Sequence, residues 1–368
     1  KQNPRLVVAE DYELVCHQRE SRFHCFKNGE ETEQSKNSFW WIQLRVLHRR
    51  RLGTATTVFC EEKSLGELVD KAFELADNTV VNPWFRFPLW RPAGAIQKNQ
   101  EQRVVAGEDP ISGNEDSFFE TLFPRLIEQP IGLEERYFGQ TETKTIIRKT
   151  EKNVICDTAS IRKLQFALVN QGRNDFFRIE DCRGFGFPYR AKEEFLESLM
   201  RKSDRLKSAR AMNRSVSGKY ILSGAVVASI LKGMESFFFG PLAVKSKSPL
   251  SEFMDQKVFS EAVSLIDDGS IRLGEGTQKF DLEGTLSQQT CLVESGVLKT
   301  FLHDASSAAR YNRGSTGNLI LSEGNIPTVG ITNFYLAPSK CEPMELFQQM
   351  QEGTYIECLD KVGKELTR

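Results

Sequence analysis

The hydrophobic residues in the first part of the chain follow the period of β-strands. Short, partly alternating apolar runs at residues 6–9, 12–16, 21–26, 39–47 and 54–59 predict strands. Lys27-Asn28-Gly29-Glu30 predicts a hairpin turn, because Asn-Gly readily adopts the backbone of a two-residue turn. Residues 64–76 change to helical spacing, and Ser64 with Glu67 resembles a capping box. The apolar stripe of this predicted helix consists of Leu65, Leu68, Val69, Ala72, Phe73 and Ala76.

The middle of the chain loses this regularity and then regains it. A break rich in proline and tryptophan predicts a linker; it contains Pro83, Trp84, Pro88, Trp90 and Pro92. Residues 137–154, 160–171 and 176–179 are then predicted as strands. Residues 191–212 predict an amphipathic helix, whose basic side we interpret as a solvated face.

The last third of the chain carries the strongest local signals. A turn at Glu294-Ser295-Gly296 separates the apolar runs 290–293 and 297–302, which predicts a hairpin. Asp304 is a predicted N-cap for a short helix that reaches Tyr311. The GSTGN loop (residues 314–318) follows. Loops of this composition are usually structural, but glycines and small polar groups also suit a loop that holds a peptide or an anion.

The composition mainly argues against some classes of partner and site. A chain of 368 residues is long enough for two lobes, each with its own core. The formal net charge of -1 shows no bias toward nucleic acid or membrane surfaces, and no apolar run reaches bilayer-spanning length. The basic triplet at residues 49–51 is interpreted as a solvated turn rather than an anion site. The eight scattered cysteines form no CxxC pair, which is typical of reduced thiols, so we expect a cytoplasmic protein.

Three motifs in the last third resemble the TldD/TldE (PmbA) family. VSLIDDGS at residues 263–270 resembles a family strand that ends in paired aspartates. GVLKTFLHDASSAARYNRGSTGN at residues 296–318 resembles its "GVL" strand, short helix and "STGN" loop. TNFYLAPSKCEPMELFQQMQEGTYI at residues 332–356 resembles its "TN-x-Y" strand and the helix that follows. The order and spacing of the three motifs agree with the family, and RLGTATT with its following helix is similar to the N-terminal pattern.

The resemblance implies a peptidase-related protein. Its type members are heterodimers of a zinc-bearing TldD subunit and a metal-free TldE subunit that process small peptides. In TldD the helix matching residues 224–238 carries HExxxH, in which the histidines bind zinc and the glutamate activates water. In this chain those positions fall at Lys232, Gly233 and Phe237, which can do neither. We therefore expect no catalytic residues and no metal or other cofactor here, with zinc on a TldD-like partner.

Together these observations predict an α+β protein in two lobes, with an N-terminal mixed sheet and helices and a β-rich C-terminal domain of the TldD/PmbA type. The predicted regions are 1–82, 83–130, 131–218 and 219–368. The resemblance implies a TldE-like, non-catalytic subunit of a zinc metallopeptidase heterodimer that is inactive alone, with a homodimer as the fallback. An autonomous peptidase with an atypical site, and a regulatory binding protein without protease activity, stay open.

The predicted peptide-channel residues combine small polar side chains with glycines that allow close backbone approach. They are Gly314, Ser315, Thr316, Gly317, Asn318 and Asn333. We expect a peptide substrate, and neither nucleic acid nor a membrane as a partner.

Overall fold

The protein is represented by a computed structural model. It describes residues 3–27, 30–81, 87, 131–149, 154–170, 178–184, 201, 218–271, 274–322, 324–339, 341–350, 352–357 and 359. The chain divides into two compact units. Unit 1 contains Lys1–Val46, Gly53–Leu75 and Ile96–Ala211, and unit 2 contains Leu47–Leu52, Ala76–Ala95 and Met212–Arg368. The predicted linker and the predicted helix at 191–212 lie outside the described residues, apart from Phe87 and Arg201.

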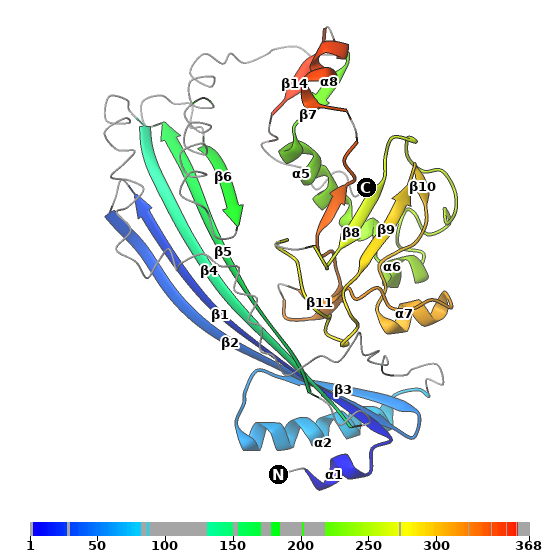
Figure 1. Cartoon of the computed structure of the whole chain (residues 1–368). Helices are drawn as coiled ribbons and strands as arrows, with labels where there is room; N and C mark the ends of the chain where they lie inside the picture. The colour runs from blue at the N-terminus through cyan, green and yellow to red at the C-terminus, as the bar shows by residue number, and fades with distance from the viewer. Residues whose placement is uncertain are drawn as a thin grey trace. The chain divides into compact units, whose positions relative to one another are not determined.

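Unit 1 is built on a six-stranded sheet with the order β3-β2-β1-β4-β5-β6 (Figure 1). Its strands are β1 (Asp11–Lys27), β2 (Glu30–His48), β3 (Arg51–Thr57), β4 (Ile131–Arg148), β5 (Val154–Asn170) and β6 (Arg178–Gly184). The pairs β1–β4, β4–β5 and β5–β6 are antiparallel. The sheet joins two regions that the sequence analysis separates, because Glu13 on β1 pairs with Arg148 on β4, 135 positions later.

The helix α2 (Glu62–Asn78) packs against this sheet through its predicted apolar stripe. Leu68, Val69, Ala72 and Phe73 form one buried cluster with strand residues that include Ile42. This stripe is confirmed. The helix begins at Glu62, so Ser64 lies inside the first turn rather than at the N-cap. Glutamate is a good helix former and is favourable near a helix N-terminus, which explains the earlier start.

Four strand predictions need correction. Residues 6–9 are not a strand, because residues 6 and 7 belong to the helix α1 (Pro4–Val7). The side-chain oxygen of Asn3 accepts a hydrogen bond from Arg5 N (3.0 Å), and proline suits the first helical position. The predicted strands 12–16 and 21–26 are one strand, β1, and the predicted strand 137–154 ends at Arg148. Alternation locates a strand better than it locates the strand's ends.

A buried ion cluster ties three strands of unit 1 together. The carboxylate of Glu13 accepts hydrogen bonds from Arg45 Nε on β2 (2.9 Å) and from Arg148 Nε on β4 (2.5 Å). All three side chains are buried. Removing one partner from such a group leaves buried charge without compensation, so the cluster fixes how β1, β2 and β4 assemble.

Unit 2 contains a four-stranded sheet with the order β10-β9-β8-β13. Its strands are β8 (Leu265–Asp268), β9 (Gln289–Glu294), β10 (Val297–Leu298) and β13 (Phe334–Leu336). The predicted hairpin is confirmed as β9 and β10. Ser295 and Gly296 both have positive φ angles, 47° and 83°, as a two-residue type I′ turn requires.

The other elements of unit 2 surround this sheet. β7 (Tyr220–Leu222) pairs parallel with β14 (Thr354–Ile356), and β11 (Leu319–Leu321) pairs antiparallel with β12 (Pro327–Val329). The helices are α5 (Gly224–Met234), the 3-10 turn η1 (Glu235–Phe238), α6 (Gly240–Val244), α7 (Ala305–Arg310) and α8 (Pro343–Met350). Asp304 caps α7 as predicted, accepting from Ser307 N (2.7 Å). The whole fold is α+β, and none of the described helices is long and apolar enough to cross a membrane.

We predict that Glu13→Gln destabilises the protein by about 3 kcal/mol, because two buried guanidinium groups lose their carboxylate. The matched control is Asp70→Asn, which removes an ion pair with Arg5 whose side chains are 65% and 59% exposed. This control should cost less than about 1 kcal/mol. Urea unfolding followed by circular dichroism measures both losses. Equal losses for the two variants would show that the cluster has no special role.

Candidate functional site

The helix that matches the zinc helix of the resembled family is α5 with its continuation η1. The Ser223 hydroxyl caps it by accepting a hydrogen bond from Val226 N (3.2 Å). The α-helix ends at Met234, earlier than the predicted end near 238, and η1 continues the chain as a 3-10 turn. Lys232 Nζ donates to Glu235 Oε2 (2.8 Å), and the Lys232 side chain is 70% exposed. Phe237 packs against the buried core of unit 2.

These side chains do not fit a zinc ion. An ammonium group, a glycine and a phenyl ring offer no lone pair at positions 232, 233 and 237. Within the described part of the chain, no three His, Cys, Asp or Glu side chains are grouped so that they could hold a metal ion. Three histidines contact separate partners: His17 with Glu142 (3.3 Å), His24 with Glu31 (2.6 Å) and His303 with Ser307 (3.1 Å).

The GSTGN loop is fastened to the backbone of His303. Thr316 N and the Ser315 hydroxyl both donate to His303 O (3.0 Å each), and Thr316 Oγ1 accepts from His303 N (2.8 Å). Gly317 has a φ of +77°, and a Cβ there would lie 2.7 Å from Leu286 O. Glycine is therefore required at 317 by the fold itself, whatever else the loop does.

Asp267 is the hub to which this loop is tied. Asn318 Nδ2 donates to Asp267 Oδ2 (2.7 Å) and to Gly330 O (3.0 Å). Thr332 donates to the same carboxylate through its N–H and through its hydroxyl (2.7 Å each). Burial raises the pKa of Asp267 above its ordinary value, and the hydrogen bonds from Thr332 and Asn318 oppose that rise. The Asn318 side chain, in a residue only 1% exposed, is thus used inside the fold.

Asn333 has a similar internal role. Its Oδ1 accepts from Gly276 N (2.9 Å), and its Nδ2 donates to Asp268 O (2.7 Å) and to Thr277 Oγ1 (3.2 Å). The structure therefore brings Asn318 and Asn333 to the end of β8, next to the paired aspartates. Sequence reasoning listed both amides but missed Asp267 and Asp268 as their anchors. The adjacent carboxylates in the LIDD segment were the available signal.

Of the predicted peptide-channel residues, Gly314 is exposed, Ser315 is half-buried, and Thr316, Gly317 and Asn318 are buried. The hydrogen bonds of Ser315, Thr316 and Asn318 stabilise the loop, which is sufficient to explain why these residues occur there. A direct contact between these residues and a peptide stays a prediction.

A different feature of the site offers groups for binding, namely the strand β13 at the edge of the four-stranded sheet. Asp268 N donates to Asn333 O (3.0 Å), and Ala337 N donates to Ser264 O (2.8 Å). Hydrogen-bonded pairs recur at every second residue of an antiparallel ladder. Residues 333, 335 and 337 therefore direct their backbone N–H and C=O groups toward β8.

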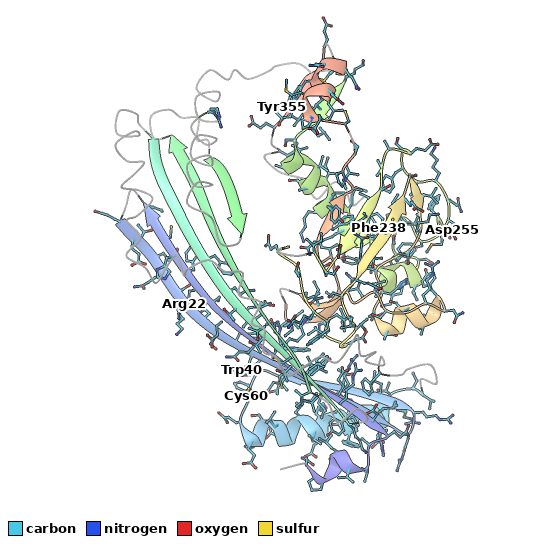
Figure 2. All side chains as sticks on the ribbon, in the orientation of Figure 1. Arg22, Trp40, Cys60, Phe238, Asp255 and Tyr355 are labelled. Atoms are coloured by element: carbon cyan, nitrogen blue, oxygen red, sulfur yellow. The ribbon has the colours of Figure 1, made fainter. Side chains whose placement is uncertain are left out.

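Phe334 and Leu336 lie between those positions, so their N–H and C=O groups point away from β8. No described residue forms a backbone hydrogen bond with these outward groups. The ring of Phe334 packs edge-on against Phe238 of η1, with centroids 5.6 Å apart; Phe238 is labelled in Figure 2. Leu336 is 40% exposed. The open edge of β13 thus begins beside the helix segment where the family carries its metal motif.

His303 is buried without a full set of hydrogen bonds. Its Nδ1 lies 3.1 Å from Ser307 Oγ, while its Nε2 has no hydrogen-bond partner among the described residues. The Tyr311 ring lies against it, with centroids 5.1 Å apart. A Cβ at Gly240 would lie 2.1 Å from His303 Nδ1, so glycine is needed there for close approach. Burial lowers the pKa of His303 to about 4; Asp304 opposes this shift and Arg313 adds to it.

We predict that Asn318→Leu destabilises the protein by about 3 kcal/mol, because the Asp267 carboxylate and Gly330 O each lose a buried donor. Ser315→Ala is the matched control in the same loop. It should cost less than about 1 kcal/mol, since His303 O still accepts from Thr316 N. Thermal unfolding measures both. If Asn318→Leu were as stable as Ser315→Ala, the Asp267 hub would not hold the loop.

A second prediction concerns acid. The folded pKa of His303 is below its unfolded value, so the unfolded chain binds a proton first as the pH falls. The stability contributed by His303 is present above pH 6.5 and is lost between about pH 6.5 and 4, on the order of 3 kcal/mol in total. His303→Asn should flatten this slope. Urea unfolding across that range checks the prediction, which fails if His303→Asn keeps the full slope.

Comparison with known proteins places this geometry in a family. Residues 217–366 match the model of the PmbA/TldA metallopeptidase C-terminal domain. A metalloprotease of Methanocaldococcus jannaschii is 22% identical over 96% of this chain and 79% of its own length. A metalloprotease TldD homolog of Buchnera aphidicola (Schizaphis graminum) is 31% identical over 30% of this chain, a match that spans only 23% of that protein.

A solved structure gives the same fold over nearly the whole chain. TldE from Thermococcus kodakarensis superposes with a TM-score of 0.78 at 17% sequence identity, covering 97% of this chain and 81% of that one. The match therefore includes the six-stranded sheet of unit 1 as well as the C-terminal domain. The α+β fold, the metalloprotease relatives and the family model agree, and residues 217–366 form a domain of the PmbA/TldA metallopeptidase C-terminal type.

Proposed function

We propose that this chain is a TldE-like, non-catalytic subunit of a zinc metallopeptidase that processes small unfolded peptides. In this proposal zinc and the water-activating glutamate belong to a TldD-like partner with an intact HExxxH motif. The observation that carries the proposal is the identity of Lys232, Gly233 and Phe237 at the positions of that motif. The protonated Lys232 has no lone pair, and Gly233 and Phe237 have no side-chain group that could ligate zinc or accept a proton.

The contacts of Lys232 and Phe237 support the loss of the zinc site from this helix rather than its relocation to neighbouring residues. The Lys232 ammonium is paired with Glu235, the only carboxylate of the helix. A cation at this position would repel a zinc ion, and Phe237 is committed to the core of unit 2. Restoring a zinc site would require all three motif positions to change.

The framework around the lost motif is nevertheless kept. The buried Asp267, the GSTGN loop and the edge strand β13 form a hydrogen-bonded unit next to α5 and η1. Such a framework could still help to hold peptides between two related chains, because only one of the two chains needs the metal. The names of the relatives, metalloprotease and TldE, support a role in peptide hydrolysis of this shared kind.

We predict that the purified chain binds no stoichiometric zinc and cleaves no unstructured peptide alone. Mixed with an HExxxH homologue from the same genome, it should form a specific dimer that carries one zinc and cleaves the peptide. Light scattering, metal analysis and a peptide digest measure these properties. An HExxxH homologue whose glutamate is changed to glutamine is the matched control, and it should form the dimer without cleavage.

Three outcomes would overturn the proposal in different ways. One zinc per chain with chelator-sensitive cleavage by the chain alone would establish an autonomous peptidase with an atypical site. A chain that remains a monomer in the presence of the homologue would favour a regulatory binding protein. A homodimer that cleaves nothing would also remove the heterodimer from the proposal.

A further inference from the structure

We propose that Cys16 and Cys60 are a redox pair, which a small disulfide oxidant such as glutathione disulfide closes reversibly to a protein disulfide. The crosslink fastens the N-terminal end of α2 to β1 and makes unit 1 more resistant to unfolding under oxidising conditions. Both residues belong to unit 1, and both are free thiols. The inference does not depend on the proposed function.

The packing of α2 on the sheet brings the two cysteines together. Cys16 lies on β1 and packs against the buried cluster that joins this strand to α2. Leu65 packs against the same cluster from the first turn of α2. Leu65 N donates to Glu61 O (3.0 Å), so this turn begins directly after Cys60, which Figure 2 labels at this end of the helix. The contact between α2 and β1 therefore carries Cys60 toward Cys16, although the two are 44 positions apart in the chain.

The electrostatics of Cys16 agree with this placement. Burial, and to a smaller extent the negative charge of the Cys60 thiolate, raise the pKa of Cys16 to about 11. A thiolate affects another thiol in this way only across a short distance, because solvent screens the interaction between more distant charges. The side chains of Cys16 and Cys60 are therefore neighbours.

The two thiols differ in exposure, which sets the order of the chemical steps. Cys60 is exposed, so a disulfide oxidant in solution reaches it first. Cys16 is half-buried and protonated at neutral pH, so it reacts second. The same difference protects Cys60 from irreversible oxidation, because a neighbouring thiol converts its first oxidised form into a disulfide that thiols can reduce.

The reaction is a double thiol–disulfide exchange. The Cys60 thiolate attacks one sulfur of glutathione disulfide, the bond between the two glutathione sulfurs breaks, and one glutathione thiolate leaves. Cys16 then gives its proton to water and attacks Cys60 Sγ, which expels the second glutathione thiolate. One protein disulfide and two reduced glutathione molecules thus replace two protein thiols and one glutathione disulfide.

A third cysteine on the same face of the sheet provides an internal control. Cys16 pairs with Thr145 on β4, and Thr145 pairs with Cys156 on β5. Because neighbouring strands are about 4.8 Å apart, the Cα atoms of Cys16 and Cys156 are about 10 Å apart. A disulfide requires Cα atoms within about 7 Å. The Thr145 hydroxyl also donates to Cys156 Sγ (3.6 Å). Cys156 is exposed like Cys60, but it cannot take the place of Cys60.

Disulfide mapping of the full chain tests the pairing. The reduced protein is incubated with glutathione disulfide and digested, and its peptides are identified by mass spectrometry. A Cys16–Cys60 linkage should account for most of the oxidised protein, and dithiothreitol should remove it. Cys60→Ser and Cys16→Ala should each abolish the linkage, whereas Cys156→Ser, the matched control, should keep it.

Three results of the mapping would overturn the inference. The first is glutathione that stays on Cys60 while Cys16 remains a thiol. The second is a linkage between Cys16 and Cys156. The third is a linkage between the Cys60 residues of two copies of the chain.

Thermal unfolding measures what the crosslink does to the fold. The oxidised protein should unfold at a temperature about 5 °C higher than the reduced protein, because the disulfide restricts the unfolded chain. Cys156→Ser should show the full increase on oxidation, and Cys60→Ser should show none. Cys60 is exposed, so its serine variant should fold even if the replacement of the half-buried Cys16 lowers stability. A disulfide that forms without raising the unfolding temperature would overturn the stabilising role.

A pH profile shows whether Cys16 performs the second step. The mixed disulfide of Cys60 with glutathione is prepared in acid, and the release of glutathione is followed after transfer to higher pH. Only the thiolate attacks, and the pKa of Cys16 is raised to about 11. The rate should therefore rise roughly tenfold for each pH unit between about pH 7 and 10. Cys16→Ala should release no glutathione over this range. A rate that does not change with pH would overturn the attack by Cys16.

Discussion

Unit 2 depends on one buried carboxylate. Asp267, at 1% exposure, accepts hydrogen bonds from Asn318 and from both the backbone and the hydroxyl of Thr332. A carboxylate is costly to bury without hydrogen-bond donors. The strand β8 can therefore be buried at Asp267 only when these donors surround the carboxylate. That requirement fixes the GSTGN loop and the start of β13 together. The open edge of β13 exists in a defined position because its inner side is held by this network.

In the proposed function, a catalytic motif is absent while its surroundings are kept. Lys232, Gly233 and Phe237 remove every zinc donor of the family motif, yet α5 and η1 still pack beside β13 through Phe238 and Phe334. Metal ligation depends on a few lone pairs, whereas the framework depends on buried hydrogen bonds and apolar packing. The two can therefore change independently.

Much of the fold was predictable from local patterns. The α2 stripe, the β9–β10 hairpin and the Asp304 cap were read correctly, because each depends on residues within one or two turns of the chain. The helix at residues 4–7 was missed, since Asn3-Pro4 outweighs a short apolar run. For the site, the sequence singled out Asn318 and Asn333 but not their hydrogen bonds to the Asp267 carboxylate and to Asp268 O, because those partners lie 51 and 65 positions away in the chain.

The sequence by itself determined that Lys, Gly and Phe stand at 232, 233 and 237, where the resembled TldD motif has two histidines and a glutamate. It also indicated the C-terminal domain of the PmbA/TldA type, because three motifs in that part of the chain kept their order and spacing. Only the tertiary structure decided that Glu13 meets Arg45 and Arg148, and that Phe334 and Leu336 turn their backbone groups outward. Pairing partners and strand order arise from contacts between segments far apart in the chain, and no local pattern of residues encodes which edge remains open.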